Sequence, residues 1–163
     1  MYYTYHPSPI GPLLLAGDGA ALHLISFPSG DRRGKPAADW QADPGPFAAV
    51  AAQLDAYFAG ELKQFELSLA PAGTAFQRQV WQTLQTIPYG QTWSYGRVAA
   101  AIGRPAASRA VGAANGRNPL PVVVPCHRVI GSTGSMTGFG GGIPTKEALL
   151  RLEMEHSQFP HTA

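Results

Sequence analysis

The pattern of apolar and polar residues in the first part of the chain predicts a small unit of strands with one helix. Apolar runs at residues 12–16 and 21–27 flank a Gly-Asp-Gly sequence at 17–19, which is typical of a hairpin turn. Apolar residues recur at helical spacing over residues 47–58. Apolar and polar residues alternate over 65–69, and this alternation predicts a third strand.

The rest of the chain has the spacing of helices. A Pro-Ala-Gly sequence at 71–73 makes a natural boundary, after which Thr74 can cap one helix and Ser94 a second. A third helix is predicted over 106–115, and the short Gly-containing turn before it gives the second and third helices a helix-turn-helix pattern. A last helix is predicted over 145–155, directly after a proline.

These elements predict an α+β protein in two parts. We expect a strand-rich α/β domain at residues 1–73, a mostly helical domain at 74–156 and a flexible tail at 157–163. The chain has 163 residues, of which 45% are hydrophobic, and this is enough to fill a core.

Composition excludes several classes of protein. No apolar run approaches the roughly 20 residues of a membrane span, and the first residues lack the features of a secretory signal. A single cysteine cannot form an intramolecular disulfide or supply a Cys-rich zinc module. We therefore expect a cytoplasmic protein with no membrane contact, no metal and no cofactor.

Charge is distributed unevenly along the chain. Residues 1–73 carry four Lys/Arg against seven Asp/Glu, whereas residues 74–163 carry eight against three. Residues 67–146 hold seven basic residues and no carboxylate. Such asymmetry indicates a polyanionic partner, although chance clustering in a chain with few charges would give the same pattern.

The predicted third helix has one face of small residues. Its inward face comprises Ala107, Val111 and Ala114, and its outward face comprises Arg109, Gly112, Ala113 and Gly116. A face of Gly and Ala with one arginine suits a helix that approaches a nucleic-acid groove closely and inserts one side chain. Tight packing within the protein is the alternative explanation.

The chemistry of the chain centres on Cys126, its only cysteine. A lone cysteine is usually a small buried hydrophobic residue, but His127 and Arg128 follow it directly. Cationic neighbours are expected to lower the pKa of the thiol. In an extended segment Cys126 and His127 would point to opposite faces, so a bridging water is easier to build than a direct bond.

The last predicted helix offers a third partner. Glu153 shares a helix face with Leu149 and Leu150, and a carboxylate on an apolar face is rare unless it is paired. His127 is the obvious candidate, which would give Cys126, His127 and Glu153 the roles of nucleophile, base and orienting group. A solvated glutamate near the end of the chain is the alternative.

Several sequence blocks resemble the O6-alkylguanine-DNA alkyltransferase family. The strongest is Pro-Cys-His-Arg-Val-Ile at 125–130, and the resemblance extends over about residues 74–155. The other blocks, in family order, lie at 76–81, 88–90, 94–95, 109–112, 118–119, 138–142 and 146–150. The resemblance implies a ribonuclease-H-like N-terminal domain followed by a winged helix-turn-helix-like domain that binds DNA and carries the active site.

The resemblance also implies a reaction. Cys126 would accept the alkyl group of O6-alkylguanine, or of O4-alkylthymine, irreversibly, and a relay of His127, water and Glu153 would activate it. Asn118 would hold the active-site turn. Tyr95 would rotate the phosphate of the lesion and protonate the leaving guanine.

Further residues would contact the base or the DNA. Arg109 would fill the gap that the flipped nucleotide leaves in the duplex, from the minor-groove side. The other DNA-contacting residues would be Ser94, Gly96, Arg104, Gln77, Ser132, Gly112 and Ala113, and the base pocket would comprise Val124, Met136, Phe139 and Gly140. Some family members have Tyr and Ser in place of Phe139 and Gly140, so backbone N–H groups would have to bind O6 here.

Other functions fit part of the pattern. A lesion sensor that binds without reacting would carry another residue in place of Cys126. A helix-turn-helix regulator explains the basic half but not the sequence at 125–130, and a cysteine hydrolase needs no DNA groove. We expect a monomer in solution and leave cooperative binding on DNA open.

Overall fold

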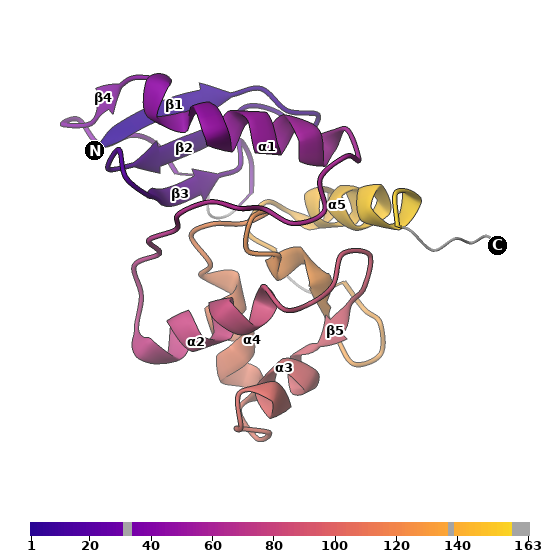
Figure 1. Ribbon diagram of the computed structural model, residues 1–163. Coiled ribbons are helices and arrows are strands. Elements are labelled where there is room, and N and C mark those ends of the chain that lie inside the picture. Colours follow the sequence, from indigo (N-terminus) through magenta and orange to yellow (C-terminus); the bar gives the residue numbers. More distant parts are fainter. Residues whose placement is uncertain (31–33, 137–138, 158–163) are drawn as a thin grey trace.

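The computed structural model describes residues 1–30, 34–136 and 139–157. The predicted flexible tail, apart from Ser157, lies outside the described residues, as does Gly138 of the family block at 138–142. In Figure 1 the strand-rich part lies above the helical part, and the last helix lies between them. The two-part α+β fold is confirmed.

The N-terminal part is a four-stranded sheet in the order β3-β2-β1-β4. Its strands are β1 (Tyr2–His6), β2 (Leu13–Gly17), β3 (Leu22–Ser26) and β4 (Gln41–Ala42). Strands β2 and β3 form the predicted hairpin, with Leu15 opposite Ile25. Four of the five residues of β1 are Tyr or His, so the strand lacks the alternation of apolar and polar residues from which the sequence could have predicted it.

The predicted third strand at 65–69 is wrong. This segment makes only an isolated parallel bridge, between Leu22 and Leu69. The edge of β3 is shared, since the N–H of Ile25 donates to the carbonyl of Pro119 in the C-terminal part at 2.9 Å. Residues 65–69 therefore cannot form strand hydrogen bonds along the whole length of β3.

The predicted helix over 47–58 is present. A 3₁₀ turn, η1 (Gly45–Phe47), leads into α1 (Ala48–Phe58), which lies across one face of the sheet. Leu54 and Tyr57 of α1 are fully buried in the core. Gly60, with a φ of 77°, then turns the chain away, a conformation that glycine adopts without steric cost.

The C-terminal part contains the predicted helices with their caps. These elements are α2 (Ala75–Leu84), β5 (Trp93–Ser94), α3 (Tyr95–Ala101), α4 (Ser108–Gly116), η2 (Cys126–Arg128), β6 (Val129–Ile130) and α5 (Ile143–Glu155). Thr74 and Gln77 form a capping box at α2, and the Ser94 hydroxyl accepts a hydrogen bond from the N–H of Arg97 at α3. Helices α3 and α4 are the helix-turn-helix pair.

One continuous core joins the two parts. Buried residues of the sheet and of α1 belong to the same apolar cluster as those of α2, α4 and α5. Among the described residues, no helix is long and apolar enough to cross a membrane.

Candidate active site

Cys126 lies at the start of a tight turn and not in the extended segment that the sequence predicted. Residues 126–128 form η2, and Asn118 holds the chain before it. The Asn118 amide donates to the carbonyl of Val124 at 2.8 Å, and its Oδ1 accepts from the N–H of Leu120 at 2.9 Å. This side chain bonds both ends of the segment that leads to the cysteine.

Backbone strain is concentrated in the same segment. Val122 has a φ of 74°, the only positive φ of a non-glycine residue in the described part of the chain. Such a conformation is costly for a β-branched residue, and it is retained only when the surrounding contacts enforce it. The contacts of Asn118 on either side supply that enforcement.

Behind the cysteine, His127 and Glu153 form the predicted pair. The distance from His127 Nε2 to Glu153 Oε2 is 2.6 Å, and both side chains are buried. Arg128 donates from Nε to Oε1 at 2.7 Å and from Nη2 to Oε2 at 3.0 Å. Tyr57 donates its hydroxyl to Oε2 at 2.6 Å. Glu153 is therefore the centre of a buried polar cluster.

These contacts determine the protonation states. Burial raises the pKa of Glu153, but hydrogen bonds and ion pairs with His127 and Arg128 outweigh it and hold the pKa well below its usual range. Burial lowers the pKa of His127 despite the bond to Glu153. A neutral His127 that donates from Nε2 leaves Nδ1 as an acceptor, and this atom is buried without a hydrogen-bond partner among the described residues.

The expected low pKa of the thiol is wrong. Burial raises the pKa of Cys126 to about 11, although the Asn118 side chain and the charge of Lys146 act in the opposite direction. Arg128 follows the cysteine closely in sequence, but its guanidinium donates hydrogen bonds to Glu153 and to the carbonyl of Ile87. Its charge is therefore paired with Glu153 and does not lower the pKa of the thiol. The thiol is protonated at neutral pH and needs a base.

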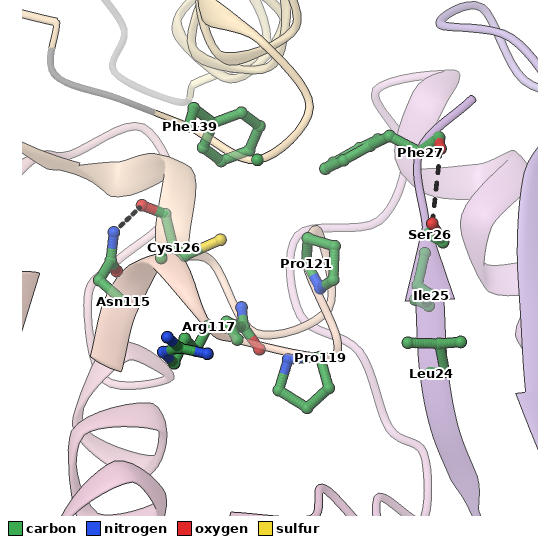
Figure 2. Close-up of a pocket in the computed structure, with 13 residues that line it drawn as sticks. Leu24, Ile25, Ser26, Phe27, Asn115, Arg117, Pro119, Pro121, Cys126 and Phe139 are labelled. Atoms are coloured by element: carbon green, nitrogen blue, oxygen red, sulfur yellow. Dashed lines mark hydrogen bonds between the residues drawn. The ribbon is translucent and has the colours of Figure 1, made fainter. Parts of the chain in front are cut away.

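The sulfur of Cys126 faces a cavity of about 120 Å³ between the two parts of the protein. Figure 2 shows Sγ pointing into the space between Phe139, Phe27 and Pro121. Strand β3 supplies one wall through residues 24–27, and the end of α4 with the following loop supplies another through 115–119. The rings of Phe27 and Phe139, which both line the cavity, lie 5.5 Å apart.

Some of the predicted base-pocket residues line this cavity and others do not. Phe139 and Gly140 line it, whereas Val124 is buried beneath the turn and Met136 is exposed. The sequence interpretation missed Asn115, which lines the cavity and donates weakly to the carbonyl of Cys126 at 3.4 Å. The β3 wall was missed as well.

A second hollow gathers most of the predicted DNA-contacting residues. It is lined by Ser94, Tyr95, Gly96, Ser108, Arg109, Gly112 and Ser132. A Cβ on Gly112 would lie 3.7 Å from the Tyr95 ring, which is an ordinary contact distance, so α4 and Tyr95 are close neighbours in this hollow. Helix α4 thus contributes Arg109 and Gly112 to this hollow, and Asn115 near its end to the cysteine cavity.

The remaining predicted DNA residues lie elsewhere on the helical part. Ala113 is exposed on α4, and Arg104 is exposed with its guanidinium 5.7 Å from the Phe76 ring centre. Gln77 is half-buried in the α2 capping box. Of the seven basic residues at 67–146, Arg128 and Lys146 are buried and the other five are exposed.

No cluster of His, Cys, Asp or Glu suited to hold a metal ion is found within residues 1–30, 34–136 and 139–157.

Comparison with known proteins covers nearly the whole chain. Residues 1–71 match the ribonuclease-like domain of 6-O-methylguanine DNA methyltransferase, and residues 75–155 match its DNA-binding domain. The chain is 52% identical over 153 residues to a methylated-DNA–protein-cysteine methyltransferase of Methanosarcina acetivorans, covering 94% of this chain and 98% of the relative. A relative of the same name from Mycobacterium tuberculosis is 52% identical over 154 residues, covering 94% and 92%.

Solved structures agree. The crystal structure of Mycobacterium tuberculosis OGT in complex with DNA superposes with a TM-score of 0.90 at 50% identity, covering 96% of this chain and 95% of that one. Together with the helix-turn-helix pair and the buried cysteine turn, this defines a DNA-binding alkyl-transfer enzyme of the DNA-repair class. The chain belongs to the 6-O-methylguanine DNA methyltransferase family.

Proposed function

We propose that this protein repairs O6-alkylguanine, and also O4-alkylthymine, in double-stranded DNA by moving the alkyl group irreversibly to its own Cys126. The observation that carries the proposal is the position of Cys126 Sγ, which faces a cavity while the buried His127–Glu153 pair lies behind it. This arrangement supplies a nucleophile, a base and space for a reacting group.

The first step is proton transfer from the thiol. Since the pKa of Cys126 is raised to about 11, His127 must accept the proton for a thiolate to form at neutral pH. We assign this role to Nδ1 of His127, reached through one bridging water, with Glu153 stabilising the imidazolium that results. The charge is then shared over a buried network that already holds Glu153 as an anion.

The second step is displacement at the alkyl carbon. The thiolate forms the S–C bond as the C–O6 bond breaks, and the electron pair passes to the purine, to which Tyr95 donates a proton. The proton that His127 took from the thiol is released to solvent, and solvent returns a proton to the Tyr95 phenolate. Backbone N–H groups near Phe139 and Gly140 bind O6 as negative charge develops there. Each molecule acts once, because a thioether has no leaving group that a hydroxyl such as that of Ser26, which also lines the cavity, could displace at neutral pH.

The target base must leave the stack before it can reach Cys126. Flipping costs a few kcal/mol, and Arg109 offsets part of it by entering the vacated space from the minor groove. The hollow around Tyr95 and Arg109 supports this assignment because four other predicted contact residues, together with Ser108, line it: Ser94, Gly96, Gly112 and Ser132. Ser108 was not predicted.

Two rival functions are less favoured. A lesion sensor that binds without reacting does not require a cysteine with a base behind it, and a regulator does not explain the cavity at Cys126. We further propose that the protein acts in the cytoplasm, since an alkyl acceptor thiol has to remain reduced. We also propose that it acts as a monomer.

Transfer of a radiolabelled methyl group from duplex DNA to protein tests the proposal. We expect label on the wild-type protein up to one equivalent and none on Cys126→Ser, which still binds the duplex. Labelling of Cys126→Ser, or repeated turnover by the wild-type protein, would refute it.

A further inference from the structure

We propose that Tyr57, which the N-terminal domain supplies, is a positioning residue for the His127–Glu153 relay of the C-terminal domain. The inference rests on the proposed relay and adds a residue from the other domain to it. The active site is then complete only when α1 is docked against α5.

The geometry of the contact is well defined. Tyr57 lies in the last turn of α1, is 0% exposed, and donates its hydroxyl to Glu153 Oε2 at 2.6 Å. The same oxygen accepts from His127 Nε2 at 2.6 Å. The tyrosine therefore touches the atom through which Glu153 orients the imidazole.

The ring of Tyr57 is fixed by its neighbours. Its centre lies 5.2 Å from that of Phe58, 5.4 Å from that of Phe65 and 6.4 Å from that of Tyr89. A ring held on three sides places its hydroxyl at one point, so the contact constrains the carboxylate and does not merely follow it.

The hydrogen bond also affects the basicity of His127. Burial and the charge of Glu153 raise the pKa of Tyr57, so its hydroxyl remains a donor at every pH at which the protein works. By donating to Oε2, it withdraws negative charge that would otherwise favour a protonated His127. Removal of this donor should raise the pKa of the imidazole and loosen the carboxylate that orients it.

The other titratable groups near Glu153 and His127 do not change charge at mildly acidic pH in a way that would mimic this effect. Arg128 pairs with Glu153, and burial raises the pKa of Tyr89. Burial lowers the pKa of Lys146, which donates to the carbonyl of Val129, but Lys146 is the same in the wild-type protein and in the Tyr57 and Tyr89 variants. The pKa of Glu153 is held well below its usual range. The fall of the alkylation rate at acidic pH, the acid limb of the pH–rate profile, therefore follows the protonation of His127.

The test compares Tyr57→Phe with Tyr89→Phe. Both variants remove one buried hydroxyl and keep the ring, and the two rings are neighbours. The hydroxyl of Tyr89 has no hydrogen-bond partner in the described part of the chain, which makes it a matched control. The rate of Cys126 alkylation by free O6-benzylguanine is measured on the full-length proteins from pH 5 to 9.

We expect Tyr57→Phe to react about tenfold more slowly at pH 7, which corresponds to a barrier about 1.4 kcal/mol higher. Its acid limb should move to higher pH, whereas Tyr89→Phe should follow the wild-type profile. In a Cys126→Ser background, NMR titration should show a higher His127 pKa with Tyr57→Phe alone.

The inference is overturned if Tyr57→Phe keeps the wild-type rate and acid limb. It is also overturned if both variants slow equally with an unshifted acid limb, because the loss would then come from packing. A wild-type protein that takes up no methyl group from duplex DNA containing O6-methylguanine would refute the proposed function itself, and the role of Tyr57 with it.

Discussion

Replacement of Glu153 by Gln removes the charge at the centre of the buried cluster and keeps the shape of the side chain. Arg128, which is 6% exposed, would then hold a cation without its carboxylate partner. Breaking a buried ion pair by removing one partner costs about 3–5 kcal/mol. This is a large part of the roughly 5–15 kcal/mol by which small domains are stable.

Urea denaturation at pH 7 measures this cost. The control is Glu155→Gln, which removes an exposed carboxylate from the same helix and should change the free energy of unfolding by no more than about 0.5 kcal/mol. A loss below about 1 kcal/mol for Glu153→Gln would show that the cluster does not depend on the charge, and the reasoning would fail.

The pH dependence of stability provides a second check on the same residue. The pKa of Glu153 is depressed in the folded protein, so its contribution is present above the unfolded value of about 4.3 and is lost as pH falls toward the folded value. The wild-type protein should therefore lose stability below about pH 4 more steeply than Glu153→Gln. Parallel curves for the two proteins would contradict the depressed pKa.

Three further predictions concern DNA binding and the cysteine turn. The affinity for undamaged duplex DNA should fall as the salt concentration rises. Because five arginines of residues 67–146 are exposed, the slope of log K against log salt concentration should be no steeper than about −4.5, and a slope near zero would exclude this surface as the DNA-binding face. Arg109→Ala should slow repair of duplex DNA more than reaction with free O6-benzylguanine, and the exposed Arg151→Ala should change neither; equal losses of both rates in Arg109→Ala would exclude the wedge role. Asn118→Ala should lower the free energy of unfolding by about 1–3 kcal/mol and reduce alkylation, because buried backbone groups lose their partners; unchanged stability in urea would contradict this.

Local rules were sufficient for the capped helices and the hairpin. The caps at Thr74 and Ser94 and the turn at 17–19 act within a few residues, so the sequence alone predicts them. Strands β5 and β6 are two residues each and pair across 34 intervening residues, from 95 to 128, so no local pattern marks them. The segment at 65–69 alternates like a strand, but its partner edge is shared with Pro119.

The sequence predicted the contact between His127 and Glu153 but not the electrostatics around Cys126. The Glu153–His127 contact followed from the rarity of a buried unpaired carboxylate. The thiol pKa did not follow, because adjacency in sequence says nothing about where Arg128 points, and its guanidinium binds Glu153. Tyr57 and the β3 wall of the cavity lie 69 or more residues away in sequence from Cys126, and only the folded chain reveals them.

Mass spectrometry of the intact protein, followed by peptide mapping, tests the central claim most directly. After incubation with an excess of duplex that contains O6-methylguanine, the account predicts one added methyl group per molecule, located on Cys126, and a repaired guanine in the DNA. An unmodified protein beside repaired DNA, or a methyl group on another residue, would contradict it.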